Sequence, residues 1–185
     1  RADDGNIQVR MNNVNTMGKL DMSQSIRVPT DEVRLDRYSL EPNDILFNHT
    51  NSKELVGKSA IFPGSDEQVT FSNHFLRLRV DESKVDPRVL VVWLVQQWRK
   101  GVFEAKCNSW VNQSTIPARV LLGLRMPLLP LETQKRMADA LDKAQELIDR
   151  RKQQIEMLDE FLQSVFLDMF GDPVSNPKGW QSQLL

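Results

Sequence analysis

LETQKRMADALDKAQELIDRRKQQIEMLDEFLQSVFLDM, residues 131–169, is the stretch that decides the fold, and it contains neither Pro nor Gly. Its apolar residues recur at the a and d positions of a heptad: Leu141, Ala144, Ile148, Ile155, Leu158, Leu162 and Val165. At about 1.5 Å rise per residue, the predicted helix is roughly 55 to 60 Å long, longer than a compact domain of this size is wide. We therefore expect the helix to lie against a partner helix.

The ends of this helix are also marked in the sequence. Pro130 prevents the helix from extending backwards, Glu132 places an acid in the first turn, and Gly171 with Pro173 ends the helix after Phe170.

One position of the apolar stripe holds Arg151. A charge at such a position costs stability unless it is paired, so Arg151 is a candidate for fixing register or partner choice. A solvated arginine whose apolar stem covers the stripe is the alternative.

Length and composition place the chain among ordinary globular proteins. Its 185 residues, 40% of them hydrophobic, suit one domain with a real core plus an extension. No apolar run approaches the roughly 20 residues of a membrane span and no signal peptide opens the chain, so we expect a soluble, cytoplasmic protein. Cys107 is the single cysteine, which excludes an internal disulfide and a cysteine-based zinc cluster. Because the chain starts at Arg1 without Met, we interpret it either as a fragment or as a chain given without a disordered beginning.

Charge is only weakly informative. Residues 1–130 hold 17 Lys and Arg against 15 Asp and Glu, and residues 131–185 hold 7 against 10. This bias neither supports nor excludes a polyanionic partner, because basic patches are local whereas composition is global.

Before the long helix, the pattern predicts short strands separated by polar loops. Expected strands are 7–11, 45–47, 58–62, an alternating strand over 69–80, and a last strand over 124–129 that closes the domain. The loops 12–21, with Gly18 as turn point, and 48–57 are polar, and the latter connects two strands as in a hairpin.

A helix is expected to start at Pro87 with Asp86 as N-cap and to run to Glu104. Trp93 and Trp98 belong to its apolar face, as core residues rather than ligand stackers. Residues 108–115 form a third polar loop, and 116–122 could form one or two helical turns. Together these elements predict an α+β fold: a globular domain with a small, mainly antiparallel sheet and flanking helices, followed by one long coiled-coil-forming α-helix.

A catalytic constellation is missing from the pattern. The chain has no G-x-S-x-G elbow, P-loop or H-E-x-x-H, and His49 and His74 lack ligands at metal-binding spacing. Asp86 with Glu104 and Lys106 has the loose shape of a metal-dependent nuclease motif, but one straight helix would hold the two carboxylates some 27 Å apart. A binding module remains, although loops rich in Asn, Gln, Ser, Thr, Lys and His also describe ordinary solvated loops.

The order of these phrases resembles a known family. EPNDILF, VGKSAIF, FSNHFLRLRV, KVDPRVLVVWL, NSWVNQSTIP and above all PLLPLETQKRM follow one another as in the specificity subunit of type I restriction-modification enzymes. The resemblance covers nearly the whole chain. It implies a target-recognition domain over 1–130, a conserved coiled-coil and dimerisation helix over 131–170, and, in DMFGDPVSNPKGW, a linker over 171–185 toward a second recognition domain.

The resemblance also implies function and partners. A subunit of this family does no chemistry; it reads one part of a split double-stranded DNA sequence and recruits methyltransferase and restriction subunits. S-adenosylmethionine, ATP and Mg²⁺ would bind those partners, with no cofactor or metal in this chain. The long helix would pair with the second half of its own subunit or, in a fragment, with a copy of itself through a two-fold interface.

Two sets of site residues follow, one from the chemistry of the loops and one from the heptad spacing of the long helix. The DNA-binding candidates are Arg10, Asn12, Asn13, Asn48, His49, Thr50, Asn51, Ser52, Lys53, Lys58, Asn108, Ser109, Trp110, Asn112, Gln113 and Ser114. The helix-pairing candidates are Leu141, Ala144, Ile148, Arg151, Ile155, Leu158, Leu162 and Val165. Two alternatives stay open: a recognition domain of a fused type II-like restriction-modification enzyme, and a coiled-coil assembly adaptor without DNA specificity.

Overall fold

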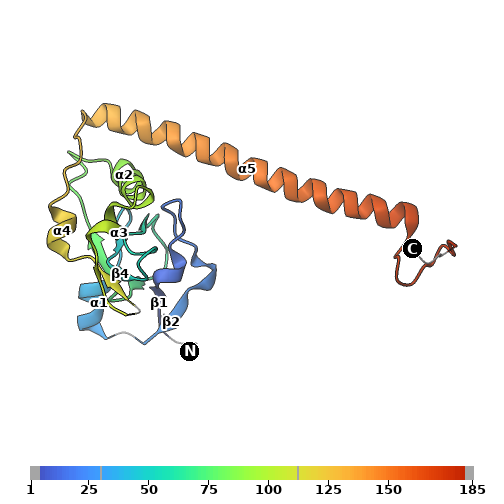
Figure 1. Cartoon of the computed structure of the whole chain (residues 1–185), viewed down its shortest axis with the longest axis horizontal. Coiled ribbons are helices and arrows are strands. Elements are labelled where there is room, and N and C mark those ends of the chain that lie inside the picture. Colours follow the sequence, from blue (N-terminus) through green and yellow to red (C-terminus); the bar gives the residue numbers. More distant parts are fainter. Residues whose placement is uncertain (1–4, 30, 112, 182–185) are drawn as a thin grey trace. The chain divides into compact units, whose positions relative to one another are not determined.

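The computed structural model describes residues 5–29, 31–111 and 113–181 of the chain (Figure 1). The chain divides into two compact units, Arg1–Ala138 and Asp139–Leu185, and this division falls inside the long helix. Among the described residues, no helix combines the length and the apolar character that crossing a membrane requires. The expected functional division into 1–130, 131–170 and 171–185 stays a prediction.

The strands of the first unit form three small sheets. The first, in the order β2-β1-β6, contains β2 (Ile26–Val28), β1 (Asn6–Val9) and β6 (Val69–Phe71), with β1 antiparallel to β2 and parallel to β6. The second, β5-β3-β7, is antiparallel and contains β5 (Ser59–Ile61), β3 (Ile45–Asn48) and β7 (Phe75–Leu78). The third, β4-β9-β8, is also antiparallel and contains β4 (Thr50–Asn51), β9 (Ser114–Thr115) and β8 (Asn108–Ser109).

Strand β3 is covered on both faces, which makes its sheet the centre of the core. Side chains of a strand point alternately to opposite faces. Leu46 therefore packs in a cluster with Val9 and Phe71 of the first sheet, whereas Ile45 and Phe47 pack in a second cluster beneath helix α2 (Pro87–Arg99). A continuous apolar run such as ILF suits a strand buried on both sides.

The helices of the first unit are short except for α2. They are the 3₁₀ turns η1 (Met11–Asn13) and η2 (Met22–Gln24), and the α-helices α1 (Glu32–Tyr38), α3 (Val102–Lys106) and α4 (Ala118–Leu122). Asp86 caps α2 as predicted by accepting a hydrogen bond from the backbone N–H of Arg88 at 2.9 Å, and Pro87 occupies the first turn. Trp93 and Trp98 pack against the second core cluster, which confirms their core role.

Helix α5 (Leu131–Phe170) has 40 residues and the predicted bounds, and is therefore about 60 Å long. Its first two turns belong to the globular unit. Gln134 holds them there: its side-chain oxygen accepts from the Asp86 backbone N–H at 2.9 Å, and its nitrogen donates to the carbonyl oxygens of Lys84 at 3.0 Å and Leu129 at 2.7 Å. This side chain is 1% exposed.

A glycine fits the tight turn between β4 and β5. Gly57 has a φ of 90°, and a Cβ added to it would lie 2.4 Å from the Phe103 ring. Phe103 of α3 in turn contacts Phe47, with ring centroids 5.0 Å apart. The turn is therefore closed onto α3 by close packing that only Gly permits.

Several expected elements were wrong in detail. Residues 69–80 form two strands in different sheets, because a turn at Ser72–His74 lets β6 pair with β1 and β7 pair with β3. The helix from Pro87 ends at Arg99, since Gly101 adopts a φ of 71° and starts the separate helix α3. Residues 124–129 form no strand, because Pro127 lacks an N–H and no neighbouring strand pairs with them in the described chain. The expected strand 7–11 ends at Val9, and β2 and α1 were not predicted.

Candidate nucleic-acid interface

The first predicted loop follows β1 and is held by hydrogen bonds to η2. The Arg10 guanidinium donates to the Gln24 backbone oxygen at 3.3 Å, and the Asn12 side-chain amide donates to the Gln24 side chain at 3.4 Å. Asn12 is exposed and Arg10 is partly exposed. Both side chains are therefore available at the end of β1.

The second loop meets the first through the turn after β6. The Ser72 backbone N–H donates to the Val9 oxygen at 2.9 Å, directly before Arg10. His49 then joins this turn to the second loop, because its Nε2 lies 3.1 Å from the Asn73 carbonyl oxygen and its backbone N–H donates to the His74 oxygen at 3.0 Å. The turn Ser72–His74 thus lies between the first two loops.

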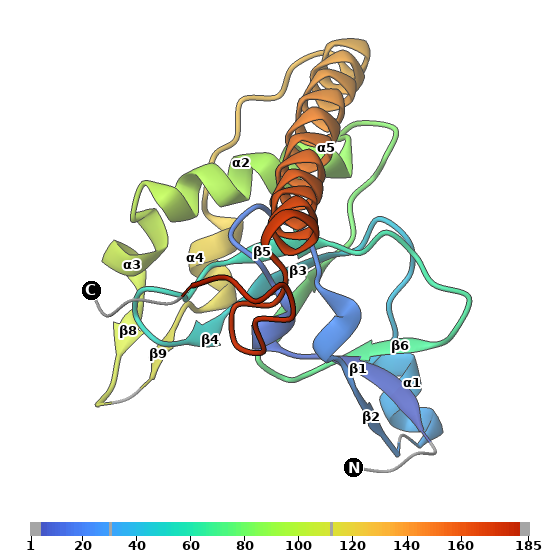
Figure 2. The same cartoon turned by 90° about the vertical axis from the view of Figure 1, so that its right-hand side faces the viewer.

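The third loop is a short hairpin attached to the second. Strand β9 lies between β4 and β8 and pairs with both. Ser114 of β9 is therefore flanked by Asn51 of β4 and by Ser109 of β8. The Trp110 backbone N–H donates to the Gln113 oxygen at 2.8 Å and closes the turn. Figure 2 shows β4, β9 and β8 side by side.

The tip of this hairpin projects two apolar side chains. Trp110 is 75% exposed and Val111 is 99% exposed. Asn112, a predicted site residue, lies outside the described residues. Asn108, Ser109 and Gln113 are exposed beside the tip. Exposed amides next to an exposed indole suit contacts with base edges and with a groove wall.

Five predicted site residues are buried, so their side chains are not available for direct contact in this conformation: Asn13, Asn48, Thr50, Lys58 and Ser114. The Asn13 amide instead organises the first loop by accepting from the Arg10 N–H and donating to the Asp21 oxygen, both at 2.8 Å. The Lys58 ammonium donates to the Val14 oxygen at 2.5 Å, and burial lowers its pKa.

The remaining members of the second loop surround β4. Asn51 and Ser52 are partly exposed, and the Asn51 side-chain oxygen accepts from the Ser52 N–H at 2.8 Å. Lys53 is exposed and lies 3.9 Å from the Glu104 carboxylate, a weak surface pair that leaves the ammonium accessible. Hydrogen bonds through the turn Ser72–His74 and strand pairing through β9 therefore connect the three loops, and we call this connected set the polar edge.

Sequence reasoning missed the turn that connects the loops. Asn73 is exposed and Gln24 is exposed, and each contacts a predicted loop residue. The phrase FSNHF indicates a turn, since Ser and Asn favour turns and interrupt strands. The alternating pattern on either side of it led instead to the prediction of one continuous strand.

The nuclease-like carboxylates stay apart in the structure. Asp86 binds its neighbour Arg88, with the guanidinium 2.8 Å from the carboxylate, and Glu104 faces Lys53. Burial alone would raise the pKa of Asp86, but hydrogen bonds from the Arg88 side chain and backbone hold it below its ordinary value. Within the described residues, no group of three His, Cys, Asp or Glu side chains gathers where a metal could bind.

The apolar stripe of α5 is a second candidate surface. Of the eight predicted helix-pairing positions, Leu141, Ala144, Ile148, Arg151, Ile155, Leu158 and Leu162 are exposed and Val165 is partly exposed. The Arg151 guanidinium donates to the Gln154 side chain of the same helix at 2.9 Å. Exposed Leu and Ile side chains in such a row are uncommon on a monomer surface.

Comparison with known proteins places this architecture in a family. The chain belongs to the family of the type I restriction modification DNA specificity domain, which it matches over residues 2–158. This match covers the polar edge and most of α5.

Two curated relatives carry names from the same systems. The chain is 34% identical over 145 residues to a putative type I restriction enzyme MjaX specificity subunit of Methanocaldococcus jannaschii, covering 78% of this chain and 34% of that protein. It is 25% identical over 130 residues to the type I restriction enzyme StySPI specificity subunit of Salmonella potsdam, covering 70% of this chain and 28% of that protein. The chain therefore spans about a third of the length of these relatives.

Two solved structures share the fold. One comes from work on the structural basis of complex assembly and conformational transition of the type I R-M system, with a TM-score of 0.58, 18% identity, and coverage of 96% of this chain and 45% of that chain. The other is the crystal structure of the HsdS subunit from Thermoanaerobacter tengcongensis, with a TM-score of 0.52, 18% identity, and coverage of 95% and 46%.

Proposed function

We propose that this chain is the non-catalytic DNA-recognition part of a type I restriction-modification specificity subunit and reads one half of a bipartite target. The observation that carries the proposal is the connected edge on which the three polar loops meet, in a chain that matches the specificity-domain family over residues 2–158. Family membership alone does not say where DNA binds, whereas the edge offers a surface with the required chemistry.

The exposed side chains of the edge suit both parts of DNA recognition. The amides of Asn12, Asn108 and Gln113 can donate to and accept from an adenine edge, while Arg10 and Lys53 can hold phosphate or guanine. Buried members of the predicted set, such as Asn13, position the loops instead. This division assigns direct readout to the exposed residues only.

A matched pair of glutamine variants tests the proposal. Gln113→Ala removes an exposed amide at the hairpin, and Gln96→Ala removes an exposed amide on α2. We expect Gln113→Ala to weaken binding to the target about tenfold or more, because one bidentate base contact contributes about 1–3 kcal/mol. Gln96→Ala should bind like the parent.

The target is obtained by methylome sequencing of cells that carry the complete system, and affinities are then measured by fluorescence anisotropy at fixed salt. Asn12→Ala and Asn51→Ala serve as variants in the other two loops. Equal affinity for all loop variants and Gln96→Ala, with unchanged melting temperatures, would contradict the placement of the interface. A complete system that methylates no defined motif would instead favour an assembly adaptor.

We infer that α5 pairs through its apolar stripe with the helix of a second half-subunit or with a copy of this chain. The exposed a and d positions over residues 141–165 support this proposal, since a partner helix would bury them. Multi-angle light scattering at micromolar concentration should therefore report a dimer of the isolated chain. A monomer would count against self-pairing.

Partners of the complete protein follow from the same proposal. We infer that methyltransferase and restriction subunits assemble on it in the cytoplasm, and that these partners bind S-adenosylmethionine, ATP and Mg²⁺. The isolated chain should neither methylate nor cleave DNA when these cofactors are supplied. Co-purification with a tagged methyltransferase subunit tests the assembly directly.

A further inference from the structure

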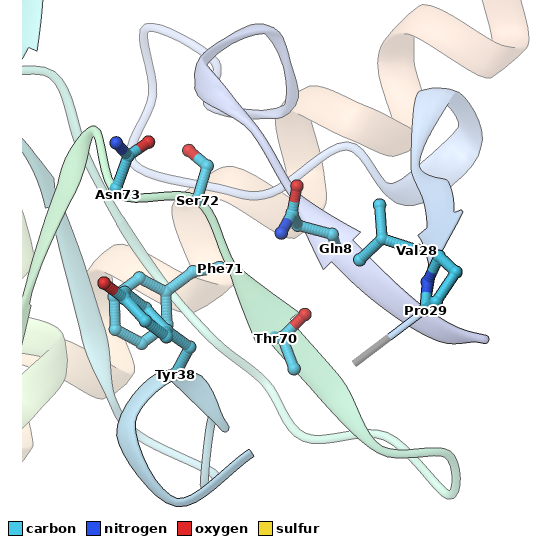
Figure 3. A pocket seen from close by; sticks show the side chains of 8 residues that line it. All are labelled: Gln8, Val28, Pro29, Tyr38, Thr70, Phe71, Ser72 and Asn73. Atoms are coloured by element: carbon cyan, nitrogen blue, oxygen red, sulfur yellow. The ribbon is translucent and has the colours of Figure 1, made fainter. Parts of the chain in front are cut away.

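A pocket of about 420 Å³ lies on the first sheet, in the globular unit. Its lining residues are Gln8, Val28, Pro29, Tyr38, Thr70, Phe71, Ser72 and Asn73. Figure 3 shows Val28 and Pro29 on one side, Tyr38 and Phe71 on the other, Gln8 and Thr70 between them, and Ser72 and Asn73 above Phe71. The volume falls within the range of about 300 to 1,000 Å³ that is typical of small-molecule sites.

Strand alternation explains why this face of the sheet is polar. Val9 and Phe71 lie opposite each other in the parallel pair and belong to the core cluster. Gln8 and Thr70, which are also paired, must point to the opposite face. The Gln8 amide is partly exposed on that face, whereas Thr70 is buried and its hydroxyl donates to the Ile7 oxygen at 3.1 Å.

The pocket is uncharged and offers specific groups. None of the eight lining residues carries a charge, and the nearby guanidinium groups of Arg37 and Arg77 lie 5.4 Å and 5.9 Å from the ring centroids of Tyr38 and Phe71. The partly exposed Tyr38 ring borders the pocket and packs edge-to-face on the buried Phe71 ring, with centroids 5.3 Å apart. The amides of Gln8 and Asn73 provide both hydrogen-bond donors and acceptors.

We propose that this pocket accepts one neutral nucleobase. A nucleobase is planar and edged with donors and acceptors, which matches the Tyr38 ring beside the amides of Gln8 and Asn73. Asn73 lines the pocket and its carbonyl oxygen also lies against His49 of the second loop. A base that has left the stack of bound DNA would therefore reach the pocket from the interface; this source of the base rests on the function proposed above.

The proposal is tested with two probes, because a base can come from DNA or from a free nucleoside. The first probe is target duplex carrying 2-aminopurine at each position in turn except the methylated base. Its fluorescence rises when the base leaves the stack, and we expect a rise at one position on binding. The second probe is each free nucleoside at millimolar concentration, followed by NMR through the side-chain amides of Gln8 and Asn73.

Gln8→Leu and Asn73→Ala should each weaken nucleoside binding about tenfold, the effect of losing one hydrogen bond of ordinary strength, and should reduce the 2-aminopurine response. Gln96→Leu on α2 is the control. Asn73 is exposed, so its variant keeps the test valid if Gln8→Leu fails to fold.

A fluorescence rise that the pocket variants remove identifies a DNA base as the ligand, and amide shifts with free nucleosides alone identify a nucleoside site. Normal target binding, with no fluorescence rise and no amide shift, would overturn the pocket proposal and leave the proposed function standing. Absence of DNA binding would refute the proposed function, while the nucleoside probe would still decide on the pocket.

Discussion

Replacing Gln134 by Met should loosen the attachment of α5 to the globular unit. Met has nearly the length of Gln but neither donates nor accepts a strong hydrogen bond, so packing is largely kept and the polar contacts are lost. Three contacts disappear together: those with the Asp86 N–H at 2.9 Å, the Lys84 oxygen at 3.0 Å and the Leu129 oxygen at 2.7 Å.

The magnitude follows from these three bonds. Each contributes about 1 kcal/mol net, and a buried group left without a partner costs about 1–3 kcal/mol. The Asp86 N–H is such a buried group, because Asp86 is 6% exposed. We therefore expect the free energy of unfolding to fall by about 3 kcal/mol, which at a slope of about 2 kcal/mol per M lowers the urea midpoint by about 1.5 M.

Urea unfolding followed by tryptophan fluorescence measures this change, because Trp93 and Trp98 pack against the second core cluster of the same unit. Gln96→Met is the matched control, since Gln96 is exposed on α2. If Gln134→Met unfolds within about 1 kcal/mol of that control, the three hydrogen bonds do not hold the start of α5, and the reasoning is refuted.

Three further perturbations have defined outcomes. Because the pKa of Asp86 is lowered in the folded chain, its charge stabilises the fold above about pH 4, and this stability is lost as the pH falls. Asp86→Asn, still a good N-cap, should flatten the acid side of a plot of urea midpoint against pH, and an unchanged plot would contradict this. Gly57→Ala should lower the free energy of unfolding by about 3 kcal/mol, measured by heat or urea, because its Cβ meets Phe103. Gly101→Ala also has a positive φ but open space around the added Cβ, so it should lower this free energy by only about 1 kcal/mol, and equal losses would refute the steric account. Arg151→Leu should tighten self-association several-fold in sedimentation equilibrium, and no change would place Arg151 outside the pairing surface.

The elements with strong local signals could be predicted from the sequence. Heptad spacing, flanking prolines and Gly171 gave both ends of α5, and Asp86 with Pro87 gave the start of α2. These signals are local, since caps and periodicity act within a few residues. The apolar run at residues 45–47 likewise predicted a buried strand.

Elements that depend on distant partners could not be predicted. Residues 69–80 alternate throughout, yet two partners far away in sequence, β1 and β3, divide them into two strands. Residues 124–129 have strand-like composition but lack a partner strand in the described chain. Pairing between remote segments decides such cases, and local composition does not contain it.

The candidate site was predictable in composition and not in exposure. The three loops were recognised from their polar residues, and hydrogen bonds connect them as one edge. Asn48 and Lys58 are polar residues like Asn12. In the structure, however, Asn48 is 0% exposed, and the Lys58 ammonium donates a hydrogen bond to the Val14 oxygen. Burial of a polar residue depends on tertiary packing, so sequence reasoning overestimated the readout set.

Gln134 and the apolar stripe lie on one uninterrupted helix. The number of residues between them therefore sets the angle around the helix axis that separates the two. One residue inserted after Ala138 would turn everything beyond it by about 100° around the helix axis. Seven inserted residues would leave the stripe within about 20° of its original direction while lengthening the helix by about 10 Å. Seven residues are therefore the smallest insertion that keeps the stripe within about 20° of its original direction.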